Sequence, residues 1–176
     1  MSLTQAAPQL QFAAAISARD RYLRASLERF ATGVVVVTAE LAEGRAAIML
    51  HAFTPVSLDP PLLLIAVEKS SPVACALRER PFAINVLGAE QGDIARRVTE
   101  ARGGDLGWVT GESAPRLRGA LAHFECLPWA TFDCGDRLLH VGRVEDYDDR
   151  PGDALGFVQG RYVVVPEYFL NAGEAY

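Results

Sequence analysis

The pattern of apolar and polar positions near the start of the chain changes from helical to extended. Over residues 20–30, Leu23, Leu27 and Phe30 recur at i, i+4 and i+7 with charged residues between them, which predicts an amphipathic helix ended by Thr32-Gly33. The β-branched run 34–38 is too short and too apolar for a surface helix and predicts a buried strand. A polar turn leads from it into the apolar segment 46–53, so these two strands are expected to pair antiparallel.

The middle of the chain alternates short apolar runs with turn and helix signals. Three prolines within residues 54–61 fix φ and remove backbone donors, so this segment is predicted to be an ordered loop or an edge strand. Ser71-Pro72 is typical of a helix start, because a hydroxyl cap precedes proline at the first helical position. The pattern also predicts strands at 62–67 and 82–87, a helix at 89–99 and a long surface excursion at 102–119.

Strands return in the last third of the chain. Apolar runs at 120–132, 137–147 and 160–165 predict them, with a turn at 133–136. Most of the predicted strands are joined by short turns, and helices are expected at only three places. This organisation predicts a mainly β (α+β) fold, a closed antiparallel barrel with flanking helices, rather than a parallel doubly wound sheet.

Composition places the chain among compact globular domains. Its 176 residues fit one domain, and a hydrophobic share of 50% with only 22% charged residues excludes a disordered chain. The net charge of −5 argues against nucleic acid and an anionic membrane as partners. We expect a domain over residues 20–170, preceded by a partly disordered N-terminal extension at 1–19.

Targeting signals and the cysteine pattern indicate the cellular compartment in which the protein is expected. The first residues lack a basic segment followed by a long apolar run, and the longest apolar stretches reach only the length of a strand, so neither a signal peptide nor a spanning helix is expected. The cysteines, Cys75, Cys126 and Cys134, cannot all pair within one chain, and none stands in a CxxC spacing. We therefore expect free thiols and a cytoplasmic protein.

A resemblance to a known family rests on segments spread over most of the chain, which are RASLERFATGVVVVTA, AFTPVSLDPPLLLIAVEKSS, FAINVL, GDRLLHVGRV and GRY. In this order they resemble the flavin reductase family of FMN-binding split barrels, and residues 53–61 are the most specific part. The resemblance implies a Greek-key split β-barrel, a homodimer, bound FMN or FAD, and reduction of that flavin by NADH or NADPH. In many relatives the reduced flavin passes to a separate monooxygenase, so the expected function is that of a reductase component.

The resemblance also implies which residues bind flavin. Before Phe53 the family usually has a Thr-Ala-Ser-Ser type run, whose hydroxyls and amides bind the flavin, and the same places here read Met49-Leu50-His51-Ala52. His51 either replaces the missing hydroxyls as a donor or is a core histidine satisfied by a neighbouring carbonyl. The turn before Pro72 offers a positive charge and hydroxyls to a phosphate, or is an ordinary helix cap. The residues expected to bind flavin are Met49, Leu50, His51, Ala52, Phe53, Ser57, Lys69, Ser70, Ser71 and Asn85.

Candidate nicotinamide contacts lie near the GRV segment. The family often has Gly-Asp-His there, whereas this chain has Gly135-Asp136-Arg137. Arg137 either binds a nicotinamide or flavin phosphate or pairs with Asp136 at a turn. The resemblance assigns Arg137 and Tyr162 to the nicotinamide. Hydride transfer depends on positioning, so no catalytic acid or base is expected.

A metal site is not expected. His123, Cys126 and Cys134 carry ligand atoms, but their spacing matches no standard zinc pattern, and His140 lies on a different segment. The alternative function is a split-barrel protein without reductase activity that binds flavin, haem or another planar ligand, with His51 or His140 as an axial group.

Overall fold

The computed structural model describes residues 18–100 and 105–167, and strands make up most of this part of the chain. Its first half contains α1 (Ala18–Leu27), β1 (Thr32–Gly33), β2 (Val35–Leu41), β3 (Gly44–Leu50), β4 (Phe53–Leu58), β5 (Pro61–Glu68), α2 (Pro72–Ala76) and β6 (Phe82–Val86). Its second half contains the 3-10 turn η1 (Ala89–Gln91), α3 (Gly92–Thr99), β7 (Trp108–Val109), β8 (Arg116–Leu117), β9 (Ala122–Cys134), β10 (Arg137–Asp149), β11 (Ala154–Val158) and β12 (Arg161–Val165).

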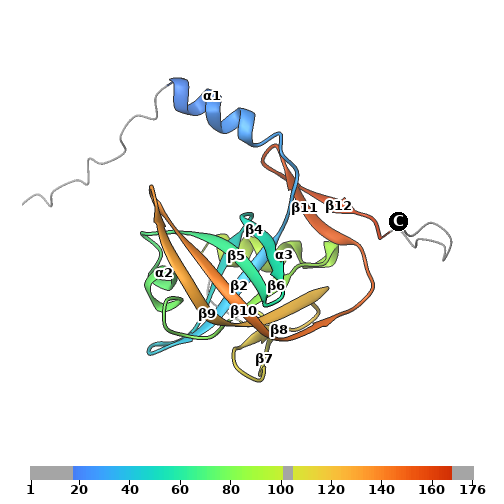
Figure 1. Ribbon diagram of the computed structural model, residues 1–176. Coiled ribbons are helices and arrows are strands. Elements are labelled where there is room, and N and C mark those ends of the chain that lie inside the picture. The colour runs from blue at the N-terminus through green and yellow to red at the C-terminus, as the bar shows by residue number, and fades with distance from the viewer. Residues whose placement is uncertain (1–17, 101–104, 168–176) are drawn as a thin grey trace, which may run out of the picture.

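The strands form one large sheet and two small ones (Figure 1). The large sheet has seven strands in the order β3-β2-β6-β9-β10-β5-β4, so several neighbours are distant in the sequence. A three-stranded sheet, β1-β11-β12, and the pair β7-β8 complete the arrangement. The strand pairs are antiparallel, which confirms the predicted mainly β class with a few flanking helices.

The described strand pairings do not show the predicted closure of the barrel. β3 and β4 are the two edge strands of the large sheet, and the described strands show no pairing between them. The reason lies just after β3, where the Ala66 amide donates to the Ala52 carbonyl at 3.2 Å and the chain turns to pair β4 with β5. The outer edge of β3 is left without a neighbouring strand.

The core lies on both faces of β2. Val35 and Val37 belong to the cluster inside the large sheet, together with Ile65 and Phe82. Val36, on the opposite face, belongs to a second cluster that includes residues of α3 and the three-stranded sheet. A strand that is buried on both faces reads as a continuous apolar run, which is the pattern that predicted it.

The first helix differs from its prediction in bounds and in burial. It ends at Leu27, and Thr32-Gly33 forms β1, which pairs with β11. In Figure 1 the helix stands away from the large sheet, beside the hairpin of β11 and β12. Tyr22, Leu23 and Phe30 are exposed, so the apolar residues that predicted the helix do not pack into the core of this chain.

The structure confirms two further local predictions and corrects a third. The proline-rich segment is the edge strand β4, and Ser71 caps α2 by accepting from the Val73 amide at 3.3 Å. Residues 105–119 are not a surface excursion, because Leu106 and Leu117 are buried there. Residues 101–104, and most of the predicted N-terminal extension, lie outside the described residues. The unpredicted strand β11 is short, contains Gly156, and depends on pairing with the distant β1.

Candidate active site

A cavity of about 1030 Å³ lies along the open edge of the large sheet. Its wall includes every residue from 46 to 52, which is most of β3 and the connection to β4. Side chains of a strand alternate between two faces, so an unbroken run of lining residues means that the strand presents its edge. An edge strand has backbone N–H and C=O groups that pair with no other strand, and this wall therefore offers main-chain hydrogen bonds to a ligand.

The remaining walls come from segments far apart in the sequence. They are mainly apolar, and the charged side chains that line the cavity, within the described part of the chain, are Glu68 and Arg137. The other lining residues are Leu27, Phe30, Thr32, Leu41, Ala66, Ser71, Pro72, Val73, Val98 and Thr99.

Two polar atoms in this cavity are buried without a hydrogen-bond partner among the described residues. They are the Thr32 hydroxyl oxygen and His51 Nδ1. The His51 ring stacks on Phe157 with ring centroids 4.2 Å apart, and Phe157 in turn contacts Tyr162 edge to face at 5.5 Å. Thr32 lies directly opposite Phe157 in the pairing of β1 with β11. Thr32 and His51 are therefore both neighbours of one aromatic residue, Phe157.

The charge state of His51 follows from its surroundings. Burial lowers the pKa of His51, and a hydrogen bond to the Gly33 backbone offsets this only in part. The imidazole is therefore neutral at neutral pH and carries one N–H donor and one acceptor.

The structure brings six of the residues expected from the resemblance into this cavity. They are Met49, Leu50, His51, Ala52, Ser71 and Arg137. Arg137 does not depend on Asp136 for a partner, because it forms an ion pair with Glu68 at 2.9 Å across the pairing of β10 with β5. Ser71 combines two roles, since it lines the cavity and caps α2.

Lys69 and Ser70, on the turn before α2, do not line the cavity. Lys69 Nζ contacts the Asp133 carboxylate at 2.6 Å and the Gly135 carbonyl at 2.7 Å, and it holds the β9–β10 turn. Ser70 is exposed on the same turn as Lys69.

Four further candidates also lie outside the lining. Phe53 packs against Phe124 in the interior, and the Ser57 hydroxyl accepts from the Asp59 amide at 3.3 Å. Asn85 is fully buried, with its amide group donating to Val36 and Thr38 and accepting from Leu117. Tyr162 lies one aromatic ring away from His51 and lines a smaller neighbouring cavity with Glu90 and Arg96.

Comparison with known proteins identifies the family. A model described as the flavin reductase like domain matches residues 27–166. The chain belongs to this family. It is 42% identical to the FMN reductase (NADH) SmoA of Agrobacterium fabrum over 149 residues, with 81% of this chain and 84% of the relative covered. It is 31% identical to the flavin-dependent monooxygenase reductase subunit HsaB of Rhodococcus jostii, with 81% and 76% covered.

A solved structure agrees with this assignment. The flavin reductase component BorF of a bacterial two-component tryptophan halogenase superposes with a TM-score of 0.77 at 35% identity, covering 84% of this chain and 99% of BorF. The resemblance read from the sequence motifs is thereby confirmed. Within this flavin reductase like domain, the cavity at the β3 edge is lined by six of the twelve residues expected from the resemblance.

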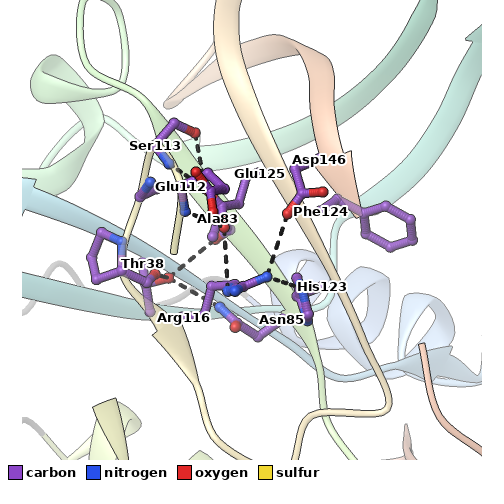
Figure 2. Close-up of polar contacts among 12 residues, drawn as sticks. Thr38, Ala83, Asn85, Glu112, Ser113, Arg116, His123, Phe124, Glu125 and Asp146 are labelled. Carbon is purple, nitrogen blue, oxygen red and sulfur yellow. Dashed lines mark hydrogen bonds and ion pairs between the residues drawn. The ribbon is translucent and has the colours of Figure 1, made fainter. Parts of the chain in front are cut away.

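A second buried polar cluster in this flavin reductase like domain lies away from the cavity lining (Figure 2). The fully buried Glu125 carboxylate accepts from the backbone amides of Glu112, Ser113 and Ala114. Arg116 Nε lies 3.2 Å from the same carboxylate. Hydrogen bonds from Ser113 and Ala114 outweigh the opposing effect of burial, so the pKa of Glu125 lies below its usual value. This cluster fastens the segment before β9 to the sheet.

The residues considered for metal or haem do not gather in the cavity. Among the residues that the structure describes, no group of three His, Cys, Asp or Glu side chains is placed to hold a metal ion. Burial raises the pKa of Cys126 to about 12. His140 is buried between strands, with Nδ1 at 3.1 Å from the Thr131 hydroxyl, and it does not line the cavity. No described helix is long and apolar enough to cross a membrane.

The sequence pattern gave no signal for several residues of the site. Thr32 and Phe157 meet only through the pairing of β1 with β11, which joins strands more than a hundred residues apart. Leu27 and Phe30 were expected to face the core, and they line the cavity instead.

Proposed function

We propose that this protein reduces flavin with NADH and that the cavity at the β3 edge holds the flavin, FMN or FAD. The observation that carries the proposal is the wall formed by residues 46–52, which combines apolar side chains with an unpaired strand edge. A flavin ring needs an apolar slot for its faces and hydrogen-bonding groups at its edge. The residues present fit such a ring, because Thr32 and His51 add two buried polar atoms that have no partner in the described chain. The names of the relatives support NADH as the reductant.

In this proposal the residues of the chain bind and orient the flavin and the nicotinamide, and they do not donate or accept protons in the reaction. When bound, the flavin supplies the redox chemistry by accepting a hydride from the reduced nicotinamide. The apolar residues of β3 exclude water from the ring, and the edge amides fix its plane. In this proposal Arg137 contacts a nicotinamide phosphate and Ser71 contacts a flavin phosphate, and the presence of both residues in the cavity lining supports these roles. Tyr162 supports the site through Phe157.

A test of the activity is anaerobic mixing of the purified protein with NADH and FMN or FAD. We expect the flavin absorption band to bleach at a rate proportional to protein concentration. A flavin that binds without bleaching would leave the fold and site in place and remove the enzymatic activity. A haem spectrum in the purified protein would favour the alternative function.

A homodimer is part of this proposal. Phe30 is exposed, yet it lines the cavity, and α1 packs little against its own chain. Phe132 is also exposed and lies beside Leu139 and Ala66 on the sheet face that borders the cavity. A second copy of the chain that covers both surfaces would bury them and close the site.

Light scattering tests this dimer directly. We expect the mass of a dimer for the wild type and that of a monomer for Phe30→Asp combined with Phe132→Asp. Tyr147 is similarly exposed but lies at the other end of β10, so Tyr147→Asp is the matched control and should keep the dimer mass. A wild-type monomer at micromolar concentration would overturn the dimer.

We further propose that the reduced flavin is consumed by a separate flavin-dependent monooxygenase. HsaB and BorF are both named as the reductase parts of two-component systems, which supports this role. Cytoplasmic location is proposed from the free thiols of Cys75, Cys126 and Cys134. Residues 20–170 are proposed to form one domain, and the family match over residues 27–166 supports these bounds.

A further inference from the structure

Among the described residues, Thr32, His51 and His140 each have a buried side-chain polar atom without a hydrogen-bond partner. Thr32 and His51 line the same cavity, whereas His140 lies between strands outside its lining. A buried polar group without a hydrogen bond costs free energy of folding. In a cavity, a bound ligand can supply the missing hydrogen bond and offset this cost.

The two residues are held close to each other by one aromatic ring. Thr32 lies opposite Phe157 in the β-ladder, and the His51 ring stacks on the Phe157 ring at 4.2 Å with an angle of 21° between the planes. The two aromatic planes are therefore nearly parallel, which fixes the plane in which the imidazole nitrogens lie.

The chemistry of the pair fits a neutral, planar ligand edge. A hydroxyl donates and accepts, and a neutral imidazole nitrogen does one or the other according to its tautomer. Neither residue supplies a positive charge, so the pair does not suit a phosphate. The pyrimidine ring of a flavin carries alternating C=O and N–H groups along one edge, which two such residues can satisfy together.

We propose that Thr32 and His51 bind the pyrimidine edge of the flavin ring, and that Phe157 is the positioning residue that orients His51. The inference deepens the proposed function and rests on it. Thr32 and Phe157 thereby join the site, and His51 acts as a ligand-binding residue rather than as a satisfied core histidine.

The test compares three flavins that share the ring and differ in their phosphates: riboflavin, FMN and FAD. Thr32→Val removes the hydroxyl at nearly constant volume, and His51→Phe removes both nitrogens but keeps an aromatic ring on Phe157. Each variant should weaken binding of all three flavins by the same factor, roughly fivefold to tenfold, as measured by quenching of flavin fluorescence. The melting temperature of the ligand-free variants should stay constant or rise, because a buried unpaired group is removed.

Thr54→Val is the matched control, because Thr54 is exposed on β4 and does not line the cavity. It should leave all three dissociation constants unchanged. A wild-type protein that binds none of the flavins would refute the proposed function itself. A wild type that binds them, with Thr32→Val and His51→Phe binding equally well, would refute only the pair.

Three other outcomes also overturn the inference. A loss limited to FMN and FAD would mean that the pair contacts a phosphate. A lower melting temperature with unchanged riboflavin affinity would mean a purely structural role. A changed mass by light scattering with unchanged riboflavin affinity would mean that the pair contacts the second copy.

The role of Phe157 is tested by a double-mutant comparison. Phe157→Leu should weaken riboflavin binding in the wild type and cause no further loss in a His51→Ala background. Phe157→Tyr, which retains the stacked ring, should restore the affinity. Equal losses in both backgrounds would show that Phe157 acts independently of His51.

Discussion

Two buried polar regions of this protein differ in how their hydrogen bonds are met. Around Glu125 and Asn85, the carboxylate and the amide group all have partners within the chain (Figure 2). Thr32 and His51, in the cavity, each keep an atom without one. A satisfied network stabilises the fold, whereas an unsatisfied pair costs stability and gains a partner only in a complex. His140 Nε2 also lacks a partner but lies outside the cavity, so we expect an unpartnered polar atom to mark a binding residue only where it faces a cavity.

The largest expected effect lies in the satisfied region. Glu125→Ala should lower the free energy of unfolding by about 3–5 kcal/mol, because Arg116 loses its carboxylate and three backbone amides lose their acceptor. Urea denaturation measures this change. Glu145, which pairs with Arg143 near the surface, is the control, and Glu145→Ala should cost less than about 1 kcal/mol. Equal losses for the two variants would contradict the comparison.

The next prediction uses a residue that the sequence suggested for flavin binding. Asn85→Ala should lower the free energy of unfolding by about 2–3 kcal/mol, because it removes the partners of Val36, Thr38 and the Leu117 amide. Riboflavin affinity of the folded variant should stay at the wild-type value. A folded Asn85→Ala protein that binds riboflavin weakly would place Asn85 in the site and contradict the distinction between the two polar regions.

Arg137 and Lys69 differ in a similar way, because Arg137 lines the cavity and Lys69 does not. Steady-state kinetics can test this difference. Arg137→Ala should raise the KM for NADH by roughly tenfold, equal to about 1.4 kcal/mol, with little change in kcat or in flavin affinity. Lys69→Ala should leave the KM unchanged, because Lys69 is engaged by Asp133 and Gly135 outside the cavity. An unchanged KM for Arg137→Ala would mean that Arg137 only forms the ion pair with Glu68 and does not bind NADH.

The smallest effect concerns pH. Burial and the charge of Arg78 lower the pKa of His140 below the usual 6.5, against a smaller contribution from the Ala74 backbone. As pH falls below 6.5, the unfolded chain binds a proton that the folded protein resists, so stability is lost toward acid. His140 contributes at most about 1 kcal/mol between pH 6.5 and 5.5. His140→Leu should show a correspondingly smaller loss of urea resistance over this range than the wild type, and identical pH profiles would exclude the contribution.

The sequence predicted those structural features that depend on residues close together in the chain. The Ser71 cap, the proline-rich edge strand and the buried run of β2 follow from the residues themselves. The family resemblance suggested Met49, Leu50, His51 and Ala52 as flavin contacts, and these residues line the cavity although they lack the hydroxyls that the family usually has there.

The rest depends on contacts between distant segments. Nothing near Asn85 in the sequence shows that its amide faces Leu117, and nothing near Thr32 indicates Phe157. Periodicity shows that α1 has an apolar stripe, but it does not distinguish a stripe covered by the same chain from one left exposed. Whether the large sheet closes likewise depends on which strand β4 pairs with, and its prolines do not specify that partner.

The unpaired edge of β3 has a consequence for how such a site changes over evolution. Recognition through main-chain groups tolerates side-chain replacement, so hydroxyls can give way to Met49 and Ala52 while the binding surface persists. Alanine scanning of this stretch would therefore report little except at His51. Proline, which deletes the amide itself, is the informative substitution along an edge that no other strand covers.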